Sequence, residues 1–235
     1  MAYDFSDVVF TLAILVRRFS HRIGTDLPMK SVRIVIFAKA PQPGFAKTRL
    51  IPALSVQGAA DLARRMFVHT LETAIAADVG SVELCVTPSV KDAVWQTLAI
   101  PDTVRWSDQG KGDLGERMAR AAQGTIDSGE SVVLIGTDCP ELSVYHIRHA
   151  ASVLQHSDSV LFPTFDGGYA LLGLNGFSQL LFTDIAWSTN TVAFETLFRL
   201  KQLGWTVRTH RMLHDIDEPA DLRWLPTTWL MKAKQ

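Results

Sequence analysis

The chain has 235 residues, of which 47% are apolar and 20% are charged, so one α/β domain can bury a sizeable core without disulfides. A formal net charge of −1 excludes a general nucleic-acid binder, because such proteins present a broad basic surface to the phosphates. The two cysteines fit neither a disulfide framework nor a zinc-ligand spacing. We therefore expect a cytoplasmic protein with no nucleic-acid partner.

The N-terminal segment contains a short apolar run, Val8–Val16, which is followed by Arg17 and Arg18. This run is well short of the ~20 residues that a membrane span requires. A secretory signal would place its cations before the apolar run, whereas here they follow it. We expect a short amphipathic helix packed on the domain, or an upstream extension that ends before Met29. An interfacial membrane helix is the alternative.

From Val32 onward, strand-like apolar runs alternate with helical patterns, which indicates βαβ units around a largely parallel sheet. Ser55 is a suitable N-cap for the first helix of this series. The strands on either side of the turn Asp166–Gly168 are expected to be antiparallel. Strands are predicted at 32–38, 81–87, 103–107, 131–136, 159–163, 169–174 and 205–210, and helices from 55 and at 91–98, 113–126, 143–155, 190–203 and 218–225. We expect one domain over 31–228, between an N-terminal extension (1–30) and a C-terminal tail (229–235).

A basic loop follows the first strand. It contains Lys39, Lys47 and Arg49, while no acidic residue occurs from Met29 through Ala60. Ligands of open parallel sheets bind beyond the carboxyl ends of the strands, where backbone N–H groups and cations can hold phosphates. Arg49 can chelate two phosphate oxygens, and Lys47 can act as a point charge on another. The glycine spacing matches neither a dinucleotide fingerprint nor a Walker loop, and the alternative is a solvated basic turn.

Aspartates stand at two further turns. Asp138 directly follows an apolar strand, which delivers it to the same sheet edge as the basic loop. Asp215 and Asp217 lie in an acidic segment near the C-terminus. Carboxylate oxygens suit Mg²⁺ or Mn²⁺ bridging a pyrophosphate, so we predict a divalent metal held by Asp138, Asp215 and Asp217. Helix capping is the alternative for Asp138 and, with equal weight, for Asp217.

Five motifs occur along the chain in a fixed order. They are Ala38-Lys39-Ala40-Pro41…Gly44…Lys47-Thr48-Arg49-Leu50, Gly112-Asp113-Leu114-Gly115-Glu116-Arg117-Met118, Gly136-Thr137-Asp138-Cys139-Pro140, Asp166-Gly167-Gly168-Tyr169 and Asp215-Ile216-Asp217-Glu218-Pro219-Ala220-Asp221-Leu222. With these motifs, the chain from Val32 to Trp224 resembles a bacterial family of glycosyltransferase-like proteins of the DUF2064 type, in the nucleotide-diphospho-sugar transferase superfamily. It is more distantly similar to 2-phospho-lactate guanylyltransferases and molybdenum-cofactor nucleotidylyltransferases. The resemblance implies an α/β, three-layer Rossmann-like GT-A fold with a mixed, mostly parallel central sheet.

The resemblance also implies roles for single residues. The expected catalytic residues are Asp138, Lys47 and Asp166. Contacts to the nucleotide and its phosphates are expected from Lys39, Gly44, Lys47, Thr48, Arg49, Gln109 and Asp113. The resemblance places Asp166, Gly167 and Gly168 on the acceptor side, and the chemistry of Trp187 and Ser188 adds these two residues as candidates there. The alternative for Asp113 is an ordinary acidic residue at a helix N-terminus. One departure is that Gly136-Thr137-Asp138 stands where many GT-A enzymes carry Asp-X-Asp, which bears on metal affinity and on glycosyl transfer itself.

The segment from Trp187 to Asn190 precedes a predicted helix. Its plain interpretation is a hydroxyl or amide cap with a hydrophobic staple from Trp187. The functional interpretation is a tryptophan that stacks on a sugar or a base, with a hydroxyl that orients the acceptor.

Residues and resemblance together predict a metal-dependent transferase that uses a nucleotide-activated donor and an unidentified small-molecule acceptor. Glycosyl transfer from a nucleoside-diphosphate sugar is the preferred reaction. Nucleotidyl transfer from a triphosphate, which releases pyrophosphate, is the alternative, and a non-catalytic nucleotide-sensing domain is the second alternative. In either transferase, electrostatics and positioning would carry the catalysis.

Overall fold

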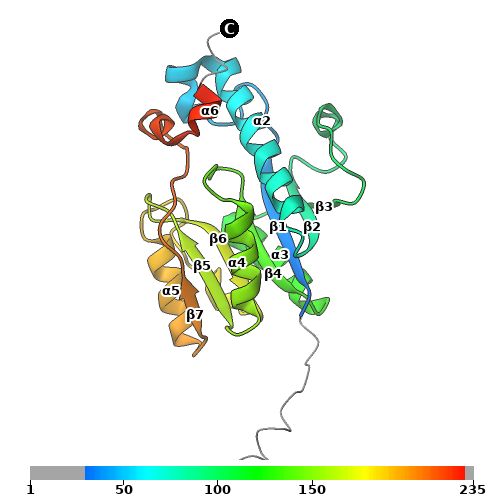
Figure 1. The fold of residues 1–235 in the computed structure, drawn as a ribbon, viewed down its shortest axis with the longest axis vertical. Helices are drawn as coiled ribbons and strands as arrows, with labels where there is room; N and C mark the ends of the chain where they lie inside the picture. The colour runs from blue at the N-terminus through cyan, green and yellow to red at the C-terminus, as the bar shows by residue number, and fades with distance from the viewer. Residues whose placement is uncertain (1–29, 231–235) are drawn as a thin grey trace, which may run out of the picture.

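Seven strands form one mixed sheet in the order β3-β2-β1-β4-β6-β5-β7 (Figure 1) in the computed structural model, which describes residues 30–230. The strand pairs are parallel except for β4 with β6 and β5 with β6, which are antiparallel. The strands are β1 (Val32–Lys39), β2 (Gly80–Thr87), β3 (Arg105–Asp108), β4 (Ser131–Gly136), β5 (Ser159–Pro163), β6 (Tyr169–Leu174) and β7 (Val207–Thr209). The predicted three-layer fold with a mixed, mostly parallel sheet is confirmed.

Helices cover both faces of the sheet, and alternate residues of β1 face the two layers. Ile34 and Ile36 pack in one core with Phe67 of α2 and Ile147 of α4. Val35 packs in the other core, with residues of α3 and α5. The helices are α2 (Ile51–Ala77), α3 (Leu114–Asp127), α4 (Val144–Leu154), α5 (Val192–Gln202) and α6 (Thr227–Leu230), and the 3-10 helices are η1 (Thr48–Leu50), η2 (Ala93–Thr97), η3 (Gln179–Leu181) and η4 (Pro219–Trp224).

The antiparallel strand β6 determines which loops meet. Because β6 runs against β4, with Leu171 opposite Ile135, its first residues lie beside the last residues of β4. The turn that precedes β6 is therefore brought to the edge of the sheet at which β1 and β4 end. Strands β5 and β6, on either side of the turn Asp166–Gly168, are antiparallel, which confirms the prediction for this pair.

Three predicted helices differ from the structure. Helix α2 begins earlier than predicted, at Ile51, since Pro52 suits a first turn. Ser55 interrupts it with a φ of 67°, and its Oγ accepts a hydrogen bond from the N–H of Gly58 at 3.2 Å, so it still caps the longer part of the helix. The segments predicted as helices at 91–98 and 218–225 form the 3-10 helices η2 and η4 instead.

All but the last residue of the predicted N-terminal extension (1–30) and most of the predicted C-terminal tail lie outside the described residues, as does the apolar run Val8–Val16. The division of the chain into these parts therefore stays a prediction. Between residues 30 and 230, no helix combines the length and the apolar character that crossing a bilayer requires.

Candidate active site

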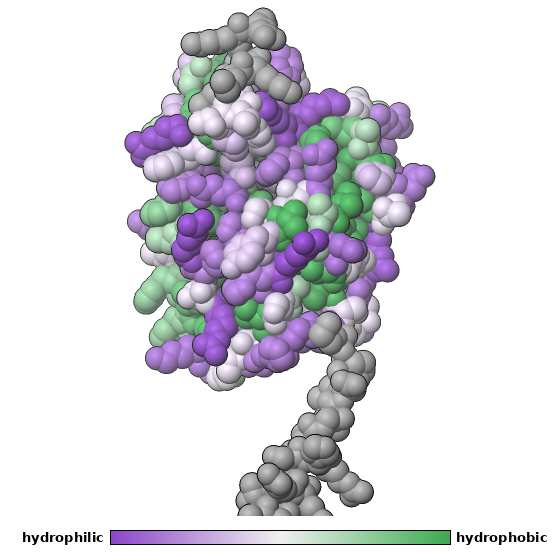
Figure 2. All heavy atoms as spheres, in the orientation of Figure 1, coloured by the Kyte–Doolittle hydropathy of each residue, from purple (hydrophilic) through white to green (hydrophobic). Residues whose placement is uncertain are grey.

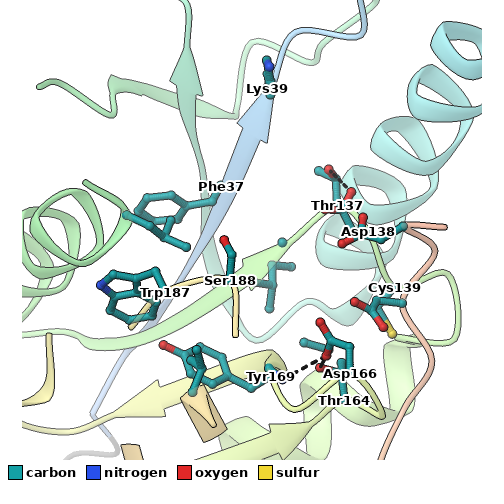
Figure 3. Close-up of a pocket in the computed structure, with 18 of the residues that line it drawn as sticks. Phe37, Lys39, Thr137, Asp138, Cys139, Thr164, Asp166, Tyr169, Trp187 and Ser188 are labelled. Carbon is teal, nitrogen blue, oxygen red and sulfur yellow. Dashed lines mark hydrogen bonds between the residues drawn. The ribbon is translucent and has the colours of Figure 1, made fainter. Parts of the chain in front are cut away.

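A cavity of about 640 Å³ opens where β1 and β4 end and β6 begins. Figure 3 shows Asp138 and Asp166 on one side of it, and Phe37, Tyr169 and Trp187 on the other. The predicted site residues that line the cavity are Lys39, Lys47, Thr48, Arg49, Gln109, Asp138, Asp166, Gly168, Trp187, Ser188, Asp215 and Asp217. Gly44, Asp113 and Gly167 are not among the lining residues.

The basic loop after β1 presents exposed cations to this cavity. Lys39 ends β1, and Thr48 and Arg49 lie in η1; all three side chains are exposed and line the cavity. The turn between them is closed by backbone bonds to the carbonyl of Gln42. Gly44 has a φ of 78°, which glycine adopts without a steric penalty, so its place is in the turn and not on the cavity wall. The loop therefore leaves Lys39 and Arg49 available to an anion.

Lys47 is arranged differently from its neighbours in the loop. Its side chain is only 8% exposed, and its Nζ lies 2.8 Å from Oδ1 of Asp138 and 2.5 Å from Oδ1 of Asp217. Burial alone would lower the pKa of Lys47, but the two carboxylates outweigh it and raise the pKa above its ordinary value. Lys47 is therefore a charged ammonium that joins the turn after β4 to the acidic segment near the C-terminus.

Asp217 of this ion pair also belongs to a group of three carboxylates, Asp166, Asp215 and Asp217, which we call the acid cluster. One oxygen of each lies within 4.8 Å of the others. Asp166 is held in place, since its Oδ1 accepts hydrogen bonds from Oγ1 of Thr164 at 2.5 Å and from the N–H of Gly168 at 2.9 Å. Burial and the charges of Asp166 and Asp217 raise the pKa of Asp215 to about 7. The cluster is thus a place where negative charge is crowded and where a cation would be favoured.

Asp138 stands apart from the acid cluster, with Lys47 between it and Asp217. Its backbone carbonyl accepts a hydrogen bond from the N–H of Ile216 at 2.9 Å, which ties the two acidic segments together. The capping alternatives are wrong, because Ser143 is the N-cap of α4 and Glu218 that of η4. The predicted ligand set of Asp138, Asp215 and Asp217 stays a prediction, and the geometry adds Asp166 to the candidates.

Aromatic side chains form the other side of the cavity (Figure 3). Burial raises the pKa of Tyr169, which keeps its phenol neutral. Trp187 packs on the first turn of α3, where a Cβ added to Gly115 would lie 2.5 Å from the indole Nε1. Only glycine at position 115 allows this close approach, so the position of Trp187 depends on it.

The segment after Trp187 is not a helix cap. The N-cap of α5 is Thr191, and it makes no side-chain capping bond. The hydroxyl of Thr189 instead donates to the carbonyl of Ala186 at 2.7 Å. The plain interpretation of this segment is therefore wrong, whereas Trp187 and Ser188 do line the cavity.

Gln109 and Asp113 make contacts within the protein. The amide of Gln109 donates to the carbonyls of Ala38 and Cys85, at 3.2 and 3.1 Å, and its Oε1 accepts from Nη1 of Arg117 at 3.3 Å. Asp113 accepts from the N–H of Glu116 and caps α3 in a capping box. The alternative for Asp113, an acidic residue at a helix N-terminus, therefore describes its place in the structure.

Arg117 lines the cavity, and although it belongs to one of the five motifs, no role was predicted for it from the sequence. Its Nε donates to the carbonyl of Gly112 at 2.9 Å, and its guanidinium is held by Gln109. The signal that could have found it is its place in the first turns of a helix that begins at the edge of the cavity.

Gly167 and Gly168 serve the backbone of the turn before β6. Gly167 has a φ of 89°, and a Cβ there would lie 2.1 Å from the carbonyl oxygen of Asn190. The carbonyl of Gly167 accepts from the N–H of Ala193 at 2.8 Å, at the start of α5. Gly168 lines the cavity and binds Asp166, so this turn connects the acid cluster to α5.

Solved structures share this architecture. A protein from Desulfovibrio desulfuricans G20, provisionally assigned as a nucleotide-diphospho-sugar transferase, is 31% identical over 85% of this chain and 88% of its own, with a TM-score of 0.78. A 4-diphosphocytidyl-2C-methyl-D-erythritol synthase from Anaerococcus prevotii DSM 20548 and a nucleotidyl transferase from Methanothermobacter thermautotrophicus are each 12% identical over 86% of this chain, with TM-scores of 0.53. The matches cover 96% of the synthase chain and 99% of the nucleotidyl transferase chain. At this identity, these two similarities show the fold alone.

No curated protein matches the sequence. A family model does match residues 70–189, and its description is an uncharacterized protein conserved in bacteria, DUF2064. This range contains α3, the turn after β4 and the turn before β6, and so includes three of the five motifs. From this match and the similarity to the Desulfovibrio protein, the chain belongs to the DUF2064 family.

Proposed function

We propose that the protein is a metal-dependent glycosyltransferase that uses a nucleoside-diphosphate sugar. The observation that carries the proposal is the division of charge within one cavity, with exposed cations on the loop after β1 and the acid cluster on the turns near β6 and η4. A donor with two phosphates and a sugar presents matching chemistry to such a cavity. The similarity to the Desulfovibrio protein supports the same reaction class.

The cations of the basic loop bind the diphosphate in this proposal. Arg49 offers a planar guanidinium that can hold two phosphate oxygens at once, and Lys39 adds a second charge. Arg117, held by Gln109, is a third cation of the cavity wall. Their charges would stabilise the diphosphate as it departs with the bonding electrons of the glycosidic bond.

The acid cluster fits a divalent ion, because its donors are hard oxygens that lie close enough to share one cation. The raised pKa of Asp215, about 7, is caused by burial and by repulsion from Asp166 and Asp217, which a bound cation would relieve. Asp166, Asp215 and Asp217 would hold Mg²⁺ or Mn²⁺. When bound, the ion would supply Lewis-acid neutralisation of the charge that develops on the diphosphate.

The aromatic side of the cavity receives the acceptor. Trp187 and Tyr169 offer apolar surface, and the hydroxyl of Ser188 lies between that surface and the carboxylates in Figure 3. Aromatic faces bind the apolar faces of sugar rings and similar molecules, while a hydroxyl can orient a polar group.

The product identifies the reaction. The protein would be incubated with a panel of nucleotide sugars or nucleoside triphosphates, a pool of small-molecule acceptors and Mn²⁺, and the phosphate products would be separated by chromatography. Glycosyl transfer releases a nucleoside diphosphate. EDTA should abolish that release if the acid cluster holds the required metal.

Nucleotidyl transfer is the second candidate, since Lys47-Thr48-Arg49-Leu50 also suits a loop that binds a triphosphate. In that case pyrophosphate would be the sole phosphate product. Tight binding of nucleotides without a product from either donor class would instead support a nucleotide-sensing domain.

A further inference from the structure

Lys47 is the only cation of the basic loop that is paired with acids among residues 30–230. Its ammonium is bound to one carboxylate oxygen of Asp138 and one of Asp217, which belong to turns far apart in the sequence. The ammonium is buried, but the two carboxylates are 50% and 38% exposed. Solutes can therefore reach the acids from outside without first removing the lysine.

The chain around this ion pair is anchored independently of it. Leu50, at the end of η1, and Ile216, between the two acids of the C-terminal segment, are fully buried in the same small core. The N–H of Ile216 also donates to the carbonyl of Asp138. Because these anchors do not involve the ammonium, the two segments can stay packed together when it leaves the carboxylates.

Two kinds of ligand compete with the same ion pair. A phosphate competes with the two carboxylates for the ammonium, and a divalent ion in the acid cluster competes with the ammonium for Asp217. A phosphate that draws the ammonium away leaves the carboxylate of Asp217 free for the metal. A metal that binds this carboxylate leaves the ammonium free for the phosphate. We propose that Lys47 is a tethered cation that couples nucleotide binding to metal binding. It occupies Asp217 and Asp138 until a phosphate draws it away, and a metal bound to the acid cluster through Asp217 releases it for the phosphate.

This inference rests on the proposed function for the identity of the two ligands. Coupling of this kind is reciprocal, and between two sites of a protein it is typically about 5- to 150-fold in affinity. A lysine that merely holds the site together would have the opposite effect on metal binding, because its removal would loosen the carboxylates.

The first test uses Mn²⁺ alone, with no nucleotide, and measures its dissociation constant from the electron paramagnetic resonance signal of free Mn²⁺. Lys47→Met should bind Mn²⁺ about ten-fold more tightly than the wild type, within the usual range of coupling. Lys39→Met is the matched control, since it removes the same charge from the same cavity and Lys39 pairs with no acid between residues 30 and 230. It should change the affinity by less than about three-fold, as expected for a screened, exposed charge. Equal or weaker binding of Mn²⁺ by Lys47→Met would overturn the inference.

The second test measures the phosphate side with UDP and GDP as probes, in EDTA. Asp217→Asn releases Lys47 from one acid and should tighten diphosphate binding by about five-fold or more. Asp166→Asn is the matched control, because it removes a charge of the same acid cluster that does not contact Lys47. An equal effect of both substitutions would mean that general electrostatics, and not the lysine, governs affinity.

A third measurement needs no substitution and so keeps the inference testable if Lys47→Met does not fold. Adding Mg²⁺ to the wild-type protein should increase the rate at which Lys47 is methylated by formaldehyde and a reductant, read by peptide mass spectrometry. An unchanged rate would count against displacement of the ammonium. If no form of the protein binds Mn²⁺, the metal of the proposed function and this inference both fail; if all forms bind it equally, only the inference fails.

Discussion

The two charged parts of the cavity are held in different ways. In the acid cluster, Asp166 is fixed by two hydrogen bonds, and the segment of Asp215 and Asp217 is tied by its backbone to the turn after β4. Lys39 and Arg49 are exposed, and neither pairs with an acid within residues 30–230. A fixed group loses little conformational entropy when a ligand binds, whereas a free long side chain loses more. The fold therefore sets the geometry of the acidic part and leaves the basic part to adapt to its ligand. On the face of the molecule that Figure 2 shows, hydrophilic and hydrophobic side chains are mixed.

The largest loss of activity is expected when a charge is removed from the acid cluster, whose groups are fixed by the fold. Asp166→Asn keeps the shape of the side chain but takes one carboxylate from the acid cluster. Turnover should fall by about 100-fold or more, as is usual when a preorganised charged group is lost from a site. Initial rates of nucleoside-diphosphate release would be compared with those of Asp102→Asn, an exposed loop residue outside the cavity. A loss smaller than about three-fold, with an unchanged thermal midpoint, would exclude Asp166 from the chemistry.

Removing an adaptable charge should cost less. Arg49→Ala is expected to weaken binding of a nucleoside diphosphate by about ten-fold or more, since charge-assisted hydrogen bonds contribute about 1.5–3 kcal/mol. Arg49→Lys would keep the charge but lose the planar fork, and should recover only part of the affinity. Titration calorimetry gives both values. If alanine and lysine at position 49 bind as the wild type does, the basic loop is not part of the nucleotide site.

A third substitution tests the aromatic side, which neither charged part holds in place. Gly115→Ala would put a methyl group 2.3 Å from the carbonyl oxygen of Phe182 and 2.5 Å from Nε1 of Trp187. Overpacking of this kind costs about 1–3 kcal/mol of unfolding free energy, measured by urea denaturation. Gly124→Ala, in the same helix, meets nothing within 4 Å and should instead stabilise the protein by about 0.5–1 kcal/mol. Destabilisation by both changes would show that the close contact at position 115 is not the cause.

The smallest expected effect is a dependence of stability on pH. Because the pKa of Asp215 is raised to about 7, the folded protein holds this proton more tightly than the unfolded chain does. The contribution of this group to stability is therefore present at acid pH and is lost as the pH rises through about 7. The midpoint of thermal unfolding, measured in EDTA at pH 5 and pH 8, should differ more for the wild type than for Asp215→Asn. An identical difference in both proteins would contradict the raised pKa.

The sequence predicted the strands more closely than the helix starts. The apolar runs of β4, β5 and β6 lie between turn residues, and their predicted bounds agree with the structure. The start of helix α2 was harder to predict. Ser55 caps the longer part of a helix that already begins four residues before it. This early start depends on the packing of η1 and α2 in one small core, which no local pattern shows. The segments at η2 and η4 are too short for periodicity to separate a 3-10 helix from an α-helix.

The candidate site could be predicted as a set of residues but not as a set of contacts. Strand ends placed the basic loop and Asp138 at one edge of the sheet, and the cavity contains them. The pairing of Lys47 with Asp217 joins residues that are 170 positions apart, and no local pattern carries that information. The approach of Asp166 to Asp215 likewise depends on how the chain returns along β7, which sequence spacing does not encode.

The hydrogen bond from the N–H of Ile216 to the carbonyl of Asp138 links the two acidic segments through main-chain atoms alone. Substitutions of side chains leave such a bond in place, and among the common residues only proline at position 216 would delete its donor. The spacing of the two segments is thus insulated from most point mutations, while the groups that they carry can be exchanged one at a time. A scaffold with this property can change its substrate by altering side chains during divergence without having to rebuild the frame that holds them.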